Sequence, residues 1–381
     1  MKLSELHRSE ETRLREFPIA KEGAFLANAA ICPLPTRVGV AMKALIDKAI
    51  QTSIDFDSYE GVYEETRELA AKLLQARPRN VALLGPTSIG LSLVANGLSL
   101  ESGDNIVYYH GDYPSNAVVW MNLAEKGVEL RRVLPREPGN IRVDDLKELV
   151  DSRTRLVALS SAHFISGFRI DLDSIGEWVK KSNALFCVDG IQTLGAIRTH
   201  VESLDFLVAD AHKWLLGPPA IGLFYVNPDI EDQLKPTLLG WHSVECPEFV
   251  TPQELTFKSD ARRYEAGSPN LTGLVALNAS LRLLLDFTIE AVEERVTSYT
   301  THIREEVREK GYTLACSDDN RLSGISSFRK EGEDTQILYN ALADAGIVTS
   351  LRATPDGKQW IRFSPHCYNT MDEINQALTL L

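Results

Sequence analysis

Three short segments of the sequence carry side chains that could perform chemistry, and each follows a run of apolar residues. Gly85-Pro86-Thr87-Ser88 comes after Val81–Leu84 and leads into an apolar stretch. A turn of this kind at the start of a helix offers free backbone N–H groups, two hydroxyls and the positive end of the helix dipole, which together favour a phosphate group. It matches neither the Walker A nor the Gly-x-Gly-x-x-Gly pattern, and by itself it could also be a plain connection.

The other two segments contribute a carboxylate and a lysine. Asp189 follows Ala184–Val188, and Lys213 comes just after Phe206–Ala209, between a histidine and a tryptophan. Lysines usually lie on solvated helix faces, so a lysine at the end of an apolar run is unusual. Asp189 and Lys213 are 24 positions apart, which is about one βαβ step, so neighbouring strands could bring them together.

A phosphate cradle, a carboxylate and a poorly solvated lysine are the groups that pyridoxal 5′-phosphate (PLP) requires of a protein. Its aldehyde forms a Schiff base with a lysine, and its ring nitrogen needs a carboxylate so that the ring can withdraw electrons. A buried lysine holds its proton less tightly, which makes its amine more nucleophilic. Asp189 alone could be a helix cap, a general base or a metal ligand, but together with Thr87, Ser88 and Lys213 it predicts a PLP site.

These residues need a scaffold that brings several strand ends to one edge. From about residue 81 to residue 226, short apolar runs alternate with amphipathic stretches, which is typical of an α/β fold. Such runs suit strands buried on both faces, as in a parallel sheet, where ligands bind beyond the carboxyl ends of the strands. The predicted strands are Val81–Leu84, Ile106–Tyr109, Leu156–Leu159, Ala184–Val188 and Phe206–Ala209, and the predicted helices between them include Val143–Val150 and Asp171–Lys181.

The sequence after residue 240 has a different pattern. Trp241–Asp260 carries Pro247 and Pro252 and little periodicity, which predicts a long loop. Helices are predicted further on, over Leu271–Phe287, Ile289–Lys310 and Met371–Leu381. We therefore expect an N-terminal segment of residues 1–22 that packs on a small domain, a large PLP-binding domain of residues 23–260, and a small C-terminal domain of residues 261–381.

Length and composition exclude several classes of protein. The 381 residues include 40 Lys and Arg against 53 Asp and Glu, a formal net charge of −13, which argues against a general nucleic-acid binder. With 44% hydrophobic residues, the chain can bury a large core. The five cysteines form no Cys-x-x-Cys pair, so we predict neither a metal site nor a disulfide framework. The charged N-terminus lacks the apolar core of a signal peptide, and no window approaches a membrane span, so we expect a soluble, cytoplasmic protein.

The sequence resembles the class V aminotransferase family of PLP enzymes, which includes cysteine desulfurases, kynureninases and isopenicillin-N-epimerase-like proteins. The most specific block is Val188-Asp189-Gly190-Ile191-Gln192, followed by Ala211-His212-Lys213-Trp214-Leu215-Leu216-Gly217-Pro218. It is similar to the family signature VDGxQ…HKWLxGP. The resemblance runs from about Phe25 to the C-terminus. It implies PLP-dependent fold type I, with a mainly parallel central sheet in the large domain and a smaller α+β C-terminal domain.

The resemblance also implies roles for individual residues. Lys213 matches the Schiff-base lysine, Asp189 the partner of the ring nitrogen, and Gln192 the residue bonded to the phenolic oxygen of the cofactor. The other matches to cofactor-binding positions are Thr87 and Ser88 in the phosphate turn, Tyr113 stacked on the ring, His163 and His212 beside the cofactor, and Asp210 near the phosphate. Ser268, in a segment similar to the family's RFEAGT, would reach the phosphate of a neighbouring subunit, which implies a homodimer. Arg362 would bind the substrate carboxylate, and Asn28 would lie near the substrate.

Some of these residues have simpler explanations. Tyr113 could be a core aromatic at a strand end, and His163 a buried histidine whose hydrogen bonds are satisfied. Arg362 could form a surface pair with Asp372 or Glu373. Asp210 stands where several relatives have a small hydroxyl residue. A carboxylate next to a phosphate is repulsive unless it is paired, so Asp210 could instead contact His212 or a backbone amide.

The implied function is that of an enzyme acting at Cα or Cβ of an L-amino acid through an external aldimine, of the aminotransferase type. A C–S lyase and an amino-acid epimerase are alternatives. A catalytically silent PLP-fold protein is a third, against which the intact Lys213, Asp189 and Arg362 weigh. The stretch Ser350–Gln359 contains no cysteine where desulfurases carry their catalytic one, and Cys367 comes after the arginine. The sequence therefore argues against persulfide-forming desulfurase activity.

Overall fold

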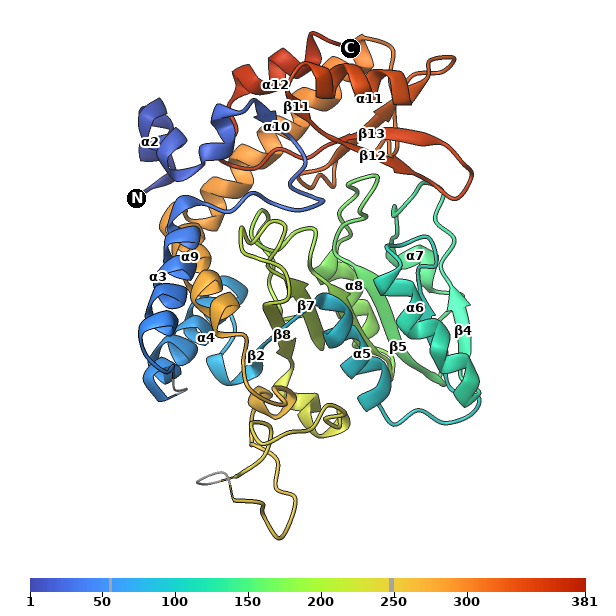
Figure 1. Ribbon diagram of the computed structural model, residues 1–381. Coiled ribbons are helices and arrows are strands. Elements are labelled where there is room, and N and C mark those ends of the chain that lie inside the picture. The colour runs from blue at the N-terminus through green and yellow to red at the C-terminus, as the bar shows by residue number, and fades with distance from the viewer. Residues whose placement is uncertain (55–56, 247–249) are drawn as a thin grey trace.

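A central sheet of the predicted α/β type dominates the computed structural model, which describes residues 1–54, 57–246 and 250–381. Within that part of the chain its strand order is β2-β8-β7-β6-β5-β3-β4 (Figure 1). Pairs from β7 to β4 are parallel, whereas β8 runs antiparallel to both β7 and β2. The strands are β2 (Val81–Leu84), β3 (Asn105–Tyr108), β4 (Glu129–Arg132), β5 (Thr154–Ser160), β6 (Leu185–Asp189), β7 (Phe206–Asp210) and β8 (Gly222–Val226).

The apolar runs form central strands because both faces of the sheet are covered. In β5, Leu156 and Ala158 pack into the cluster with α5 and α6, while Val157 and Leu159 pack into the cluster on the opposite face. Alternate residues of one strand thus enter two cores, which requires a continuous apolar run. The mainly parallel sheet and the five predicted strands are confirmed.

Helices cover the two faces of this sheet. On one face lie α5 (Thr87–Gly97) and α6 (Ser115–Met121), and on the other lie α4 (Glu60–Leu74), α8 (Leu172–Val179) and α9 (Leu271–Phe287). Asp171 caps α8 by accepting a hydrogen bond from Ser174 N, as its position before an apolar helix predicts. Helix α7 (Val143–Leu146) is shorter than predicted. Helix α3 (Thr36–Gln51) packs against α9.

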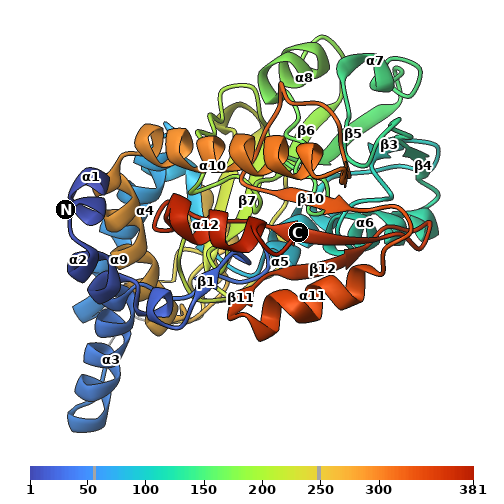
Figure 2. The same ribbon diagram turned by 90° about the horizontal axis from the view of Figure 1, so that it is seen from above.

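A second, antiparallel sheet stands over the carboxyl ends of the central strands (Figure 1). Its order is β12-β13-β10-β9, and α10 and α12 lie side by side on it (Figure 2). A short parallel pair, β1 with β11, adds to this region. The elements are β1 (Ala24–Phe25), α10 (Ile289–Glu309), β9 (Thr313–Leu314), β10 (Ser326–Arg329), α11 (Thr335–Asp344), β11 (Ile347–Val348), β12 (Ser350–Ala353), β13 (Gln359–Phe363) and α12 (Met371–Leu378).

The N-terminal helices contact both the C-terminal elements and α9. These helices are α1 (Leu3–Arg8) and α2 (Glu10–Glu16). Arg13 forms an ion pair with Glu373 at 2.7 Å, and Phe17 stacks on Tyr368 with ring centroids 4.3 Å apart. Because α9 itself packs on α3 and α4, the start of the predicted small domain is in contact with helices of the predicted large one.

The predicted loop at residues 241–260 contains no helix or strand among its described residues. Pro247 lies outside the described residues. Val244 and Phe257 form an isolated antiparallel bridge. In the described part of the chain, no single helix is long and apolar enough to cross a membrane; only α9 and α10 taken together, bent by 80° at their junction, meet the criteria of length and composition.

Candidate active site

Most of the side chains predicted to bind a cofactor or substrate meet at one cavity of about 260 Å³. It lies at the carboxyl ends of β6 and β7, beside the first turn of α5, and residues of β12 and β13 complete its wall. The predicted residues that line it are Thr87, Ser88, Tyr113, Asp189, Gln192, His212, Lys213 and Arg362.

Lys213 and Asp189 reach the cavity from neighbouring parallel strands, as their spacing predicts. Asp189 is the last residue of β6, and Lys213 follows the end of β7 by three positions. Burial lowers the pKa of Lys213 to about 8, against an opposing effect of Asp189. Burial raises the pKa of Asp189 to about 7, although its Oδ1 accepts a hydrogen bond from Ile191 N. A cationic ring nitrogen placed beside this carboxylate would favour its charged form.

The first turn of α5 supplies hydroxyls and backbone donors to the cavity. Thr87 and Ser88 open the helix, where N–H groups have no intrahelical acceptor. Thr87 Oγ1 accepts a hydrogen bond from Asp210 N at 3.0 Å, so its hydroxyl proton is still available to donate. The helix lies close to β7 because residue 90 is glycine; a Cβ there would come within 2.4 Å of Val208 Cγ1. This turn has the donors that an anionic phosphate needs.

Gln192 and Tyr113 line other sides of the cavity. Gln192 Oε1 accepts a hydrogen bond from Trp214 Nε1 at 3.1 Å, and its Nε2 donates to Ala29 O at 3.3 Å, which fixes the orientation of the amide. The ring centre of Tyr113 lies 5.2 Å from Lys213 Nζ. Tyr113 is 46% exposed, so it is not a core aromatic.

Asp210 lies behind the cavity wall. Its Oδ1 is 3.0 Å from His212 Nδ1, and its Oδ2 accepts a hydrogen bond from Ala220 N at 3.1 Å. Both partners that the sequence suggested, the histidine and a backbone amide, are therefore present. The Asp210 carboxylate does not line the cavity, whereas His212 does.

Arg362 is buried in β13 with its guanidinium at the cavity. It donates to Phe164 O at 2.6 Å, and its buried Nε has no acceptor among the described residues. The alternative of a surface pair fails because Arg362 is only 1% exposed and Glu373 is paired with Arg13. A buried guanidinium with an open donor suits an incoming carboxylate.

Besides Asp210, three predicted residues lie outside the cavity wall. His163 Nε2 lies 3.1 Å from Gly111 O, and burial lowers the pKa of its ring, which fits the simpler explanation of a satisfied core histidine. Asn28 donates to Ser364 O at 3.0 Å, so it ties the N-terminal strand to the C-terminal sheet. Ser268 is exposed in the loop before α9 and does not reach the cavity of its own chain.

The donor set fits PLP by its chemistry. Asp189 offers a buried carboxylate, Lys213 a buried amine of lowered pKa, and the first turn of α5 offers phosphate donors around Thr87 and Ser88. Gln192 adds an amide of fixed orientation. These groups belong to one continuous cavity, as a single bound cofactor requires.

Comparison with known proteins identifies the family. The family described as "Aminotransferase class-V" matches residues 25–377. The chain belongs to the class-V aminotransferase family. A probable cysteine desulfurase of Methanothermobacter thermautotrophicus is 27% identical, covering 96% of each chain. Among solved structures, the apo cysteine desulfurase of Thermococcus onnurineus matches with a TM-score of 0.88 at 23% identity, over 97% of this chain and 96% of that one. A complex of the cystine C–S lyase C-DES with cysteine persulfide matches with a TM-score of 0.87 at 20% identity, over 95% and 98%.

Membership of the class-V family confirms fold type I and PLP as the cofactor. The chain is a PLP-dependent amino-acid enzyme of this family. The prediction against desulfurase activity is not borne out, because relatives named cysteine desulfurases match along nearly the whole chain. The lack of a cysteine in Ser350–Gln359 is thus too narrow a criterion on which to exclude that activity.

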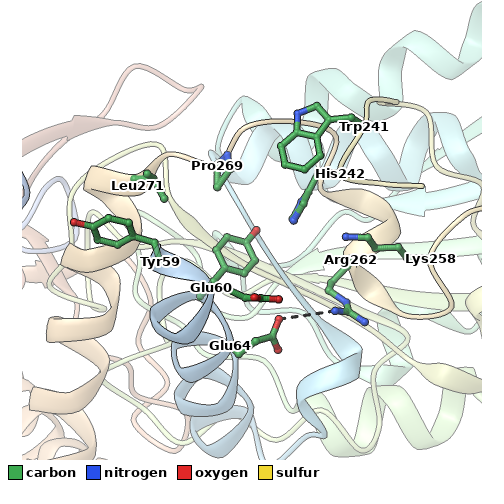
Figure 3. A pocket seen from close by; sticks show the side chains of 10 residues that line it. Tyr59, Glu60, Glu64, Trp241, His242, Lys258, Arg262, Pro269 and Leu271 are labelled. Atoms are coloured by element: carbon green, nitrogen blue, oxygen red, sulfur yellow. Dashed lines mark ion pairs between the residues drawn. The ribbon is translucent and has the colours of Figure 1, made fainter. Parts of the chain in front are cut away.

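A second cavity, of about 230 Å³, lies between the start of α4 and residues from 241–242 and 258–271 (Figure 3). Glu64 projects from α4 toward Arg262, and the two are 3.9 Å apart. Lys258 and His242 lie on the same side as Arg262 (Figure 3). None of the predicted cofactor residues lines this cavity, so the predicted chemistry belongs to the first one.

Two sets of functional or supporting residues were not predicted. Arg352 lines the active-site cavity together with Arg362, and the alternation of residues along β12 and β13 was the signal that could have revealed it. Glu265, three residues before Ser268, forms a buried ion pair with Arg67 at 2.8 Å. The two residues of this pair are 198 positions apart in the sequence, so no local sequence pattern indicates the contact.

Proposed function

We propose that this class-V protein is an aminotransferase-type enzyme that removes the α-proton of an L-amino acid. The observation that carries the proposal is Arg362, a buried guanidinium with no carboxylate within ion-pair distance among the described residues, in the same cavity as Lys213 and Asp189. Its planar fork of donors suits the α-carboxylate that every α-amino acid carries.

The roles of the chain's own residues follow from this arrangement. Arg362 holds the substrate carboxylate, which turns Cα toward Lys213. The Nζ of Lys213 is partly neutral near pH 7 because burial lowers its pKa to about 8, so it can take the α-proton and return it. Bound PLP supplies a ring that accepts the electron pair left at Cα. Asp189 stabilises the proton on the ring nitrogen, and Thr87 with the first turn of α5 holds the phosphate.

The fate of the proton separates the possible reactions. Its return to the cofactor side gives amino-group transfer, loss of a substituent at Cβ gives elimination, and its return to the other face of Cα gives an epimer. A C–S lyase is the second candidate, because relatives are named cysteine desulfurases and a structural neighbour is a cystine C–S lyase. A protein without catalysis would have no need for a buried lysine, carboxylate and arginine in one cavity.

We also propose a homodimer in which Ser268 of one subunit reaches the phosphate site of its partner. Ser268 is exposed, and its loop borders the second cavity through Pro269. A dimer that exchanges this loop would bury it. A Ser268→Ala variant should then keep its dimer but bind PLP more weakly, as measured by ultracentrifugation and equilibrium dialysis.

The test is a panel of amino acids supplied to the holoenzyme. Amino-group transfer to 2-oxo acids, release of pyruvate or sulfide, and formation of the D-isomer are measured separately. We expect transfer to dominate, and Lys213→Ala to abolish all three reactions while the protein stays folded. Activity retained by Lys213→Ala would refute the assignment, and release of pyruvate or sulfide without transfer would favour the lyase.

A further inference from the structure

Arg352 is a second guanidinium in the active-site cavity, and the sheet register explains why it faces there. In the antiparallel hairpin, Ser350 pairs with Arg362 and Arg352 pairs with Trp360. Paired residues and every second residue along a strand share one face, so both arginines lie on the same face of the hairpin. They are diagonal neighbours, about 7–8 Å apart at the backbone.

Neither arginine has an acidic partner in the part of the chain that the structure describes. Arg362 donates to Phe164 O and to Ser350 Oγ, and Arg352 donates to the carbonyl of its own neighbour Leu351 at 2.9 Å. No carboxylate lies within 4 Å of either guanidinium there, whereas buried arginines elsewhere, such as Arg67, have a carboxylate partner.

The guanidinium groups of Arg352 and Arg362 repel each other, and no carboxylate among the described residues neutralises them. Burial and, after it, the charge of Arg352 lower the pKa of Arg362 to about 9. Both side chains still carry their charge at neutral pH. Such an arrangement is costly in the free protein, and a ligand with two negative groups would offset the cost.

The proposed function accounts for only one of these cations. The α-carboxylate of an amino acid satisfies Arg362, the more deeply buried of the two, and leaves Arg352 without an anion. Arg352 is partly exposed and lines the cavity on the substrate side, with Arg362 and Phe164. The charged or polar side chains that act on it most closely, Tyr113 and Tyr339, carry hydroxyls and no carboxylate.

We propose that Arg352 binds a side-chain carboxylate of the substrate, so that the enzyme selects acidic amino acids. The inference rests on the proposed function, because it takes Arg362 as the site of the α-carboxylate. It assigns Arg352 as a specificity-determining residue that touches the substrate but does not take part in proton transfer.

The test uses two unreactive acids of equal carbon number, succinate with two carboxylates and butyrate with one. Their binding to the holoenzyme is measured by calorimetry. A charge-assisted hydrogen bond corresponds to about a 10- to 100-fold change in affinity, so succinate should bind tighter than butyrate by about that factor. Arg352→Gln should abolish the difference by weakening succinate alone, and Arg352→Lys should restore part of it.

The controls separate failure of this inference from failure of the proposed function. Arg132→Gln removes an exposed arginine of β4 with the same loss of charge, and it should leave both affinities unchanged. Arg362→Gln should weaken both acids; if it weakens neither, the proposed substrate orientation is wrong. If Arg362→Gln acts as expected but the wild-type protein binds both acids equally, or Arg352→Gln weakens both to the same extent, the selection of acidic side chains is refuted.

Discussion

The buried pair of Arg67 and Glu265 is expected to be worth far more to stability than ion pairs at the surface. Glu265 accepts four hydrogen bonds: two from Arg67, at 2.8 and 3.2 Å, one from Tyr63 OH at 2.8 Å and one from Leu83 N at 2.7 Å. The side chains of Arg67 and Glu265 are only 2% and 3% exposed. Removing one member of such a pair leaves an uncompensated buried charge, which costs about 3–5 kcal/mol.

The substitutions are Arg67→Met and Glu265→Gln. In Glu265→Gln the amide NH₂ takes the place of one oxygen and faces a donor of Arg67, so the change costs hydrogen bonds as well as charge. The matched control is Lys147→Gln, because Lys147 and Asp144 form an ion pair at 2.6 Å with side chains that are 55% and 84% exposed. A pair of that kind contributes about 0–1 kcal/mol.

The assay is equilibrium unfolding in urea, with thermal unfolding in parallel. The double variant Arg67→Met with Glu265→Met should lose less than the sum of the single changes, because no lone charge remains buried. It should still be less stable than the wild type, since Leu83 N and Tyr63 OH lose their acceptor at about 1–3 kcal/mol each. If the two single variants lose no more than Lys147→Gln does, the buried-pair reasoning is refuted.

Three further outcomes are expected. Since only the neutral amine of Lys213 attacks an aldehyde and burial lowers its pKa to about 8, the rate of PLP uptake by the apoprotein should rise about tenfold from about pH 7 to about pH 9 and then level off. A stopped-flow rate that continues to rise past about pH 10 would show an ordinary lysine. Asp189→Asn should weaken PLP binding about 10- to 100-fold in equilibrium dialysis, and an unchanged affinity would show that the carboxylate does not contact the cofactor. Gly90→Ala should lower the free energy of unfolding by about 1–3 kcal/mol because its Cβ would lie 2.4 Å from the stiff side chain of Val208, whereas Gly39→Ala, with nothing within 4 Å, should raise it by about 0.5–1 kcal/mol. Equal effects of the two glycine substitutions would contradict the packing argument.

The sequence could predict those parts of the fold and site that depend on residues close together in the chain. Continuous apolar runs are required where alternate residues enter two cores, so strands such as β5 could be found without a structure. Asp189 and Lys213 lie within a few residues of strand ends, and a parallel sheet collects those ends at one edge. Their convergence could therefore be predicted from spacing alone.

The parts that sequence could not predict depend on pairing between distant segments. Arg352 reaches the cavity because of the register of β12 against β13, and a shift by one residue would turn it away. His163 and Asn28 match cofactor and substrate positions in type and place, yet hydrogen bonds to Gly111 and Ser364, which are distant in the sequence, hold them outside the wall. The hydrogen-bond partners of such a polar side chain are set by tertiary packing, which the local sequence does not reveal.

The residues that line the active-site cavity come from distant parts of the sequence, so the ribosome adds them at different times. The cofactor-facing groups are complete once Lys213 has been translated, but Arg362, which closes the substrate side, comes 149 residues later. At typical rates of translation, this delay is on the order of ten seconds. During that interval the side of the cavity that Arg352 and Arg362 later line has not been made. The nascent large domain is thus expected to lack the site for a substrate carboxylate until the C-terminal sheet docks.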